Sequence, residues 1–276
     1  GINSMMPLIS ILVVFGGFMG FDLDKSESWT WIFAIIGGVV ITVGIAGLFL
    51  IDESNIQPTK TRYLENLTYG FRPSTAKANR ELYVMLAVFA LFNISIQTYM
   101  PYLILYYEVS LGMANYVLIM APAIILAAVV TAFWGKVYDR RGFRFSALAA
   151  LGALNLGYIV LYFTRATVPV FLGSLLMMSG YLSGMAVFGA FVRDYTPAGK
   201  SGQFQGLRIF AQVLIPGVIG PAIGAAVLKN AETIVNNDGT TSFIPNENIF
   251  LWAFIAAIFT WLVLLPLFRK EKNNAA

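Results

Sequence analysis

Residues 135–144 read GKVYDRRGFR and separate two long apolar runs, 114–134 and 145–163. The short stretch carries most of the charge in this part of the chain, whereas neither run contains an Asp, Glu, Lys, Arg or His. About twenty apolar residues suffice for a helix to cross the roughly 30 Å hydrocarbon core of a bilayer. The stretch therefore predicts a charged turn between two membrane-spanning helices.

The composition extends this interpretation to the whole chain. Of its 276 residues, 58% are hydrophobic and 12% are charged, whereas a soluble domain carries about 25% charged residues. We therefore expect an all-α integral membrane protein and exclude a soluble enzyme or a nucleic-acid-binding module. The chain has no Cys and no His, which excludes disulfides, thiolate chemistry, imidazole metal ligands and Ser-His catalysis. We expect no enzyme activity, no cofactor and no metal.

Charge-free apolar runs predict eight transmembrane helices. They lie at 5–21, 29–51, 82–107, 114–134, 145–163, 168–192, 209–228 and 249–268. Of the 18 Lys and Arg residues, only Lys25, Arg165 and Lys229 fall on the side opposite the connections 52–81 and 135–144. Because cytoplasmic loops carry the excess of Lys and Arg, we predict a multi-pass plasma-membrane protein with both termini in the cytoplasm.

The segment 52–81 contains Pro58 and Pro73 and has no hydrophobic period. It predicts a cytoplasmic central loop, which divides 1–51 from 82–276. Two spans precede this loop and six follow it, so we expect an N-terminally truncated chain. Residues 1–51 would then be the last two helices of an N-terminal bundle, and 82–276 a C-terminal six-helix bundle.

The stretch 135–144 resembles the Gly-x-x-x-Asp-Arg-x-Gly-x-Arg signature of the major facilitator superfamily, which joins the second and third helices of each six-helix half. It falls between the second and third spans after the central loop, where the second-half copy belongs. The resemblance implies a twelve-helix transporter for a small-molecule substrate, of which this chain holds helices five to twelve.

The residues of this signature predict a conformational latch. Its glycines permit a tight turn, and its aspartate can cap the next helix or pair with a basic side chain in one access state only. The predicted latch consists of Gly135, Asp139, Arg140, Arg141, Gly142 and Arg144. The alternative is a basic turn that only sets orientation.

A second stretch, 194–208, reads DYTPAGKSGQFQGLR. It loosely resembles the loop before helix eleven of the glycoside-pentoside-hexuronide:cation symporters, with Lys200 at the position of the motif's basic residue and Gly206 at that of its later glycine. We expect a functional cytoplasmic loop that includes Asp194, Lys200 and Arg208.

A substrate-lining face is predicted in 82–107, where Asn93 and Gln97 follow at helical spacing and Tyr99 lies beside them. Carboxamides both donate to and accept from sugar hydroxyls, and aromatic faces stack on sugar rings. Asn155 and Gln212 are similar candidates in other spans. The alternative for each carboxamide is a hydrogen bond that holds neighbouring helices together.

No predicted span has an Asp, Glu, Lys or Arg in its interior, although a cation-coupled carrier normally needs an intramembrane carboxylate for H⁺ or Na⁺. The symporter resemblance places those acids in early helices of the first half, so the coupling ion would bind outside this chain and the missing helices would be needed as partners. We expect a secondary active transporter that couples sugar or glycoside uptake to a cation by alternating access. An exporter or uniporter of apolar compounds and an inactive truncated membrane scaffold remain alternatives.

Overall fold

The computed structural model describes residues 21, 25–50, 68–113, 115–235 and 241–274. The chain divides into two units, Ile2–Arg62 and Tyr63–Ala276. In the first unit, α2 (Ser26–Leu50) is an apolar helix long enough to cross a membrane, and Ile32 is its one buried residue. Exposed apolar side chains are what a helix in contact with lipid requires. The described part of the predicted span 29–51 therefore lies in a helix, and residues 5–20 of the predicted span 5–21 lie outside the described residues.

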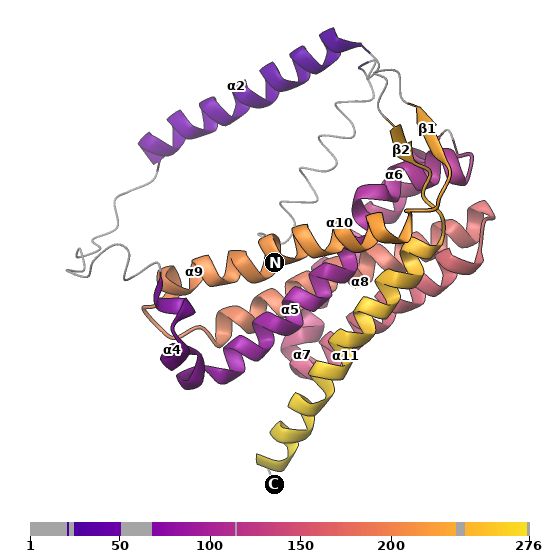
Figure 1. Cartoon of the computed structure of the whole chain (residues 1–276). Coiled ribbons are helices and arrows are strands. Elements are labelled where there is room, and N and C mark those ends of the chain that lie inside the picture. Colours follow the sequence, from indigo (N-terminus) through magenta and orange to yellow (C-terminus); the bar gives the residue numbers. More distant parts are fainter. Residues whose placement is uncertain (1–20, 22–24, 51–67, 114, 236–240, 275–276) are drawn as a thin grey trace. The chain divides into compact units, whose positions relative to one another are not determined.

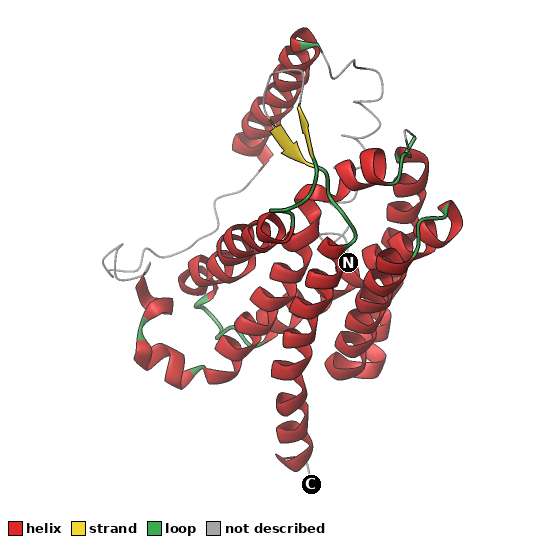
Figure 2. Cartoon of the chain, turned by 45° about the vertical axis from the view of Figure 1, so that its right-hand side comes forward, coloured by secondary structure: helices red, strands yellow, loops and turns green. Residues whose placement is uncertain are grey.

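The second unit is a helical bundle with one short hairpin (Figures 1 and 2). Its first part comprises η1 (Tyr69–Phe71), α4 (Pro73–Ala78), α5 (Arg80–Tyr99), η2 (Met100–Tyr102), α6 (Leu103–Leu105) and the π-helix η3 (Tyr106–Ser110). There follow α7 (Val117–Phe163), α8 (Thr167–Asp194), α9 (Ser201–Ile209), the π-helix η4 (Phe210–Leu214), α10 (Ile215–Val227), β1 (Thr233–Val235), β2 (Thr241–Phe243) and α11 (Asn248–Asn274). The antiparallel strands pair Thr233 with Phe243 and Val235 with Thr241.

The long helix α7 folds back on itself at Gly142, whose φ of 76° and ψ of 174° are not helical. Trp134 Nε1 lies 3.4 Å from the carbonyl oxygen of Ser146, although twelve residues of straight helix would span about 18 Å. The backbone conformation at Gly142 is open almost only to glycine. Residues 117–134 of one predicted span and 145–163 of the next therefore both lie in α7, on either side of this turn.

Helix α8 packs closely against both parts of α7. The Oγ of Ser183 lies 3.4 Å from the Oγ1 of Thr131, before the turn. After the turn, a Cβ added at Gly180 would come within 2.3 Å of the backbone nitrogen of Leu154. Only a residue without a side chain allows this approach, in the manner of small-residue packing between transmembrane helices.

Helix α5 lies between α10 and α11 and contacts both (Figure 1). Burial on several sides explains why its described residues include more buried side chains than exposed ones. The stretch that precedes α10 widens into the π-helix η4 just before Pro216. A proline has no N–H to give to the preceding turn, which favours such a local change.

Among the described residues, six helices are long and apolar enough to cross a membrane. One of them is α7, which contains two of the predicted spans. The described part of the predicted central loop contains η1, α4 and the first residues of α5. The hydroxyl of Tyr83 donates to the carbonyl of Gly70 and attaches η1 to α5.

Candidate functional site

The three candidate residues of α5 face different neighbours. Asn93 is 6% exposed, and its Nδ2 donates to the carbonyl of Phe89 in the same helix at 2.9 Å. Gln97 is partly exposed and lies against Gly220 of α10, where an added Cβ would approach the Gln97 Cβ to 2.4 Å. Tyr99 is fully buried. The structure therefore does not bring these side chains together on one open face.

The ring of Tyr99 packs between α7 and α11. Its centroid lies 5.4 Å from that of Tyr158 and 5.9 Å from that of Phe250. Beside it, Ser95 Oγ donates to the carbonyl of Ala253 at 2.7 Å and therefore accepts from the hydroxyl of Tyr158, 3.0 Å away. This chain of hydrogen bonds joins α5, α7 and α11 in the bundle interior.

Three of the five predicted substrate-binding residues keep a buried polar atom that has no hydrogen-bond partner in the described part of the chain. These atoms are the hydroxyl of Tyr99, Oδ1 of Asn155 and Nε2 of Gln212. A buried polar group without a partner costs about 1–3 kcal/mol, and in native proteins it indicates a water, an ion or a ligand. Asn155 lacks a donor, whereas Gln212 lacks an acceptor.

Gln212 lies in the π-helix η4, and its other amide atom is occupied. Arg208 Nε donates to Gln212 Oε1 at 3.3 Å, one turn before it. This contact orients the carboxamide so that its NH₂ group is the free end. Gln212 and Arg208, both predicted functional residues, thus contact each other in this structure.

The predicted latch residues surround the turn at Gly142, and their charges point outward. Asp139, Arg140 and Arg141 are exposed, and no ion pair joins Asp139 to another described residue. Arg141 lies over the ring of Phe145 at 5.3 Å, and Arg144 lies over that of Phe268 at 5.5 Å. In this structure the arginines therefore contact aromatic rings.

Phe143, a neighbour of the latch residues, makes the contacts that hold this turn. Its ring centroid lies 4.2 Å from Phe191 and 6.1 Å from Phe188 in α8, and 5.8 Å from Phe268 in α11. No pattern in the sequence singled out Phe143. The sequence shows only that an aromatic residue lies within a charged turn. This pattern does not indicate which helix the ring contacts.

The residues of the predicted functional loop connect three elements at this same end. The hydroxyl of Tyr138 donates to Asp194 Oδ2 at 3.5 Å, which joins the turn of α7 to the end of α8. Lys200 Nζ donates to the hydroxyl of Tyr69 at 2.6 Å. The segment that precedes α5 is thereby attached to the start of α9, where Tyr69 also packs edge-on against Phe204 at 5.8 Å.

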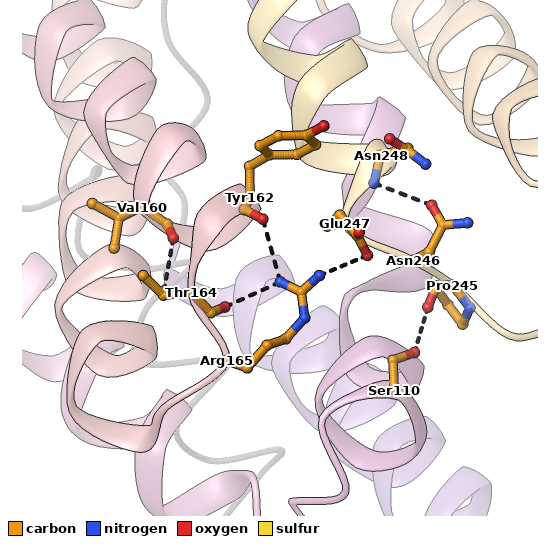
Figure 3. A network of polar contacts seen from close by, with 9 residues as sticks. All are labelled: Ser110, Val160, Tyr162, Thr164, Arg165, Pro245, Asn246, Glu247 and Asn248. Carbon is orange, nitrogen blue, oxygen red and sulfur yellow. Dashed lines mark hydrogen bonds and ion pairs between the residues drawn. The ribbon is translucent and has the colours of Figure 1, made fainter.

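A second polar cluster, which the sequence analysis also missed, lies at the other end of the same helices (Figure 3). Arg165, in the link between α7 and α8, forms an ion pair of 2.7 Å with Glu247, just before α11. Its other amino group donates to the carbonyls of Tyr162 and Thr164 at 3.3 and 3.2 Å. The Oγ of Ser110 donates to the carbonyl of Pro245 and adds the end of η3 to the cluster.

Long apolar helices, a hairpin at a glycine-containing charged turn and uncharged polar atoms in the interior define a multi-pass membrane protein. No group of three or more His, Cys, Asp or Glu side chains among the described residues is placed to hold a metal ion.

Comparison with known families identifies this class. The sequence model of the Major Facilitator Superfamily matches residues 1–221, and the chain belongs to this superfamily. It is therefore a membrane transporter that sits in a lipid bilayer and binds a small-molecule substrate. No curated protein and no solved structure matches the chain.

Proposed function

We propose that this transporter is a secondary active carrier that couples the uptake of a sugar or glycoside to a cation gradient by alternating access. The proposal rests chiefly on one observation, the unpaired buried atoms of Asn155 and Gln212. One is an acceptor and the other a donor, and a sugar hydroxyl can satisfy either. Asn93, Gln97 and the ring of Tyr99 complete the proposed substrate-binding set.

The electrostatics of the described spans favour an uncharged substrate. Their acidic residues lie at helix ends or in the α7 turn, as with Glu81, Glu108, Asp139 and Asp194. A charged substrate in this interior would have no opposite charge to offset its desolvation. Because the acidic residues of the described spans lie only at helix ends or in the α7 turn, we place the carboxylate that binds H⁺ or Na⁺ outside the described residues.

The proposed conformational cycle uses the turn at Gly142 as a latch. Asp139 is exposed and has no ion-pair partner among the described residues, so it is available to pair in another access state. The contact of Tyr138 with Asp194 joins this turn to the end of α8. Residues 195–200 connect that end to α9 and the following η4, and Lys200 attaches the start of α9 to Tyr69. A change at the latch would thereby reach the helix that carries Gln212.

The test measures uptake of a panel of radiolabelled sugars and glycosides into proteoliposomes under imposed Na⁺ or H⁺ gradients. We expect Asn155→Leu and Gln212→Leu to lower uptake of the transported sugar at least tenfold, because each removes a hydrogen-bonding atom from the site. Ser146→Ala is the matched control, because the Ser146 Oγ is also buried without a partner but is not assigned to the substrate.

Three results would overturn the proposal. Uptake of apolar compounds with no response to any sugar would favour an exporter or uniporter of apolar substrates. Wild-type uptake in Asn155→Leu and Gln212→Leu, as in Ser146→Ala, would remove Asn155 and Gln212 from the substrate site. Complete absence of transport would favour a scaffold.

A further inference from the structure

A small cavity of about 100 Å³ lies at the Gly142 end of the bundle, between the start of α5, the end of α8 and α9. Leu82, Leu86 and Phe204 form part of its wall. The polar part of the lining consists of Arg193, Thr196, Ser201, Gln205 and Arg208, with no Asp or Glu. Two positive charges therefore line a cavity that offers no negative side chain of its own.

Little compensates these two charges. Arg208 is half-buried, and among the described residues its guanidinium makes one hydrogen bond, from Nε to Gln212 Oε1 at 3.3 Å. Its Nη2 atom lies near Gly189 of α8, where an added Cβ would be 3.8 Å away, so no side chain from that position covers the guanidinium. Arg193 meets its neighbour Asp194 at 3.4 Å, with both side chains well exposed. Such a surface pair contributes little.

The start of α9 adds further donors at the same place. Helix α9 begins at Ser201, which lines the cavity, and its N-cap residue Lys200 makes no side-chain capping hydrogen bond. The first N–H groups of a helix have no partner within that helix, and the helix dipole favours an anion beside them. The hydroxyl of Thr196 donates to the carbonyl of Val192 at 2.6 Å, so it is not a free donor here.

We propose that this cavity is a binding site for a phosphate group, held by Arg193 and Arg208 and by the start of α9. Arginine presents a planar fork of donors that matches phosphate oxygens. A cavity of about 100 Å³ admits one phosphate group, and the rest of the molecule would extend outward. The bound group would join the end of α8 to α9.

Two sources can supply this group at the end of a membrane helix. One is free phosphate or a phosphate ester in solution, and the other is the headgroup of an anionic phospholipid. The chemistry of the contact is the same for both, so the experiment uses one arm for each source.

The test follows the thermal unfolding midpoint of the purified full chain at constant ionic strength. The first arm titrates inorganic phosphate in neutral detergent, and the second compares vesicles of phosphatidylcholine with and without phosphatidylglycerol. A rise of the midpoint in the first arm identifies free phosphate as a ligand, and a rise only in the second identifies the headgroup.

The variants distinguish specific binding in this cavity from non-specific attraction of the anion to the basic protein. We expect Arg208→Gln to weaken the response about tenfold, and Arg208→Lys to weaken it less because it keeps the charge and loses the fork. Arg193→Gln should also weaken it. The control is Arg80→Gln, which removes an exposed arginine at the start of α5, outside the cavity lining.

The proposal is overturned if neither arm raises the midpoint of the wild-type chain. It is also overturned if Arg80→Gln weakens the response as much as Arg208→Gln does, or if both Arg208 variants respond like the wild type. Sugar uptake enters none of these measurements, so the result is independent of the proposed transport function.

Discussion

The same three helices meet at both ends of the α7 hairpin, yet different forces join them there. At the Gly142 end, Phe143 of α7 packs against Phe191 of α8 and Phe268 of α11. At the Arg165 end, the link between α7 and α8 is joined to the start of α11 by the ion pair of Arg165 with Glu247 (Figure 3). The end richer in charge is thus held by aromatic rings.

This difference separates two roles of charge in a membrane protein. Most Lys and Arg residues at the Gly142 end are exposed, which suits a signal of orientation that needs no partner. The arginine at the other end is one of few there, and it contacts an acidic side chain and two carbonyls. The number of charges near a turn therefore does not indicate whether charge stabilises it.

The largest effect is expected from removing the aromatic contacts at the Gly142 end. Phe143→Ala should lower the free energy of unfolding by about 3 kcal/mol, because it deletes a ring that packs on three others. Denaturant unfolding in detergent measures this loss. Phe145→Ala, at a residue 46% exposed, is the control and should cost less than about 1 kcal/mol. Equal losses in the two variants would contradict the role given to Phe143.

A smaller loss is expected from the turn itself. Gly142→Ala should cost about 2 kcal/mol, since φ of 76° with ψ of 174° is a conformation that residues with a Cβ avoid. Gly135→Ala is the matched control: its Cβ would meet nothing within 4 Å, and alanine favours a helix over glycine by up to about 1 kcal/mol. Thermal unfolding of both variants decides the point, and a stabilised Gly142→Ala protein would refute it.

At the Arg165 end, a still smaller and salt-dependent loss is expected. Arg165→Gln should lower stability by about 0.5–1 kcal/mol, because the pair is partly exposed and solvent screens it. A double-mutant cycle with Glu247→Gln isolates the coupling between the two side chains. The comparison of the two ends fails if this coupling exceeds the loss in Phe143→Ala.

The smallest change in stability is expected at Asp139. Asp139→Asn should alter the unfolding free energy by less than about 0.5 kcal/mol, because the side chain is exposed and has no ion pair among the described residues. The latch prediction adds that this variant slows turnover more than it weakens substrate binding. Unchanged turnover in proteoliposomes would reduce the turn to a signal of orientation.

The sequence predicted the described helices better than it predicted their faces. Seven of the predicted spans overlap α2, the stretch from α5 to η3, α7, α8, the stretch from α9 to α10, and α11, because the hydropathy of a segment is a sum over its own residues and does not depend on its neighbours. For α5, hydropathy says little about which face of the helix meets which neighbouring helix. Its interior is apolar on nearly every side, so the spacing of Asn93 and Gln97 did not reveal that one bonds its own helix and the other meets Gly220.

The amino-acid sequence alone determined that this is a multi-helix membrane protein of the transporter class, with a charged, glycine-containing turn in residues 135–144. These properties depend on local composition and on the conformations open to single residues. Only the tertiary structure decided that Phe143 meets Phe268, that Arg165 meets Glu247, and that Arg193 and Arg208 line one cavity. Such pairs depend on the order and rotation of the packed helices, which many weak contacts set together.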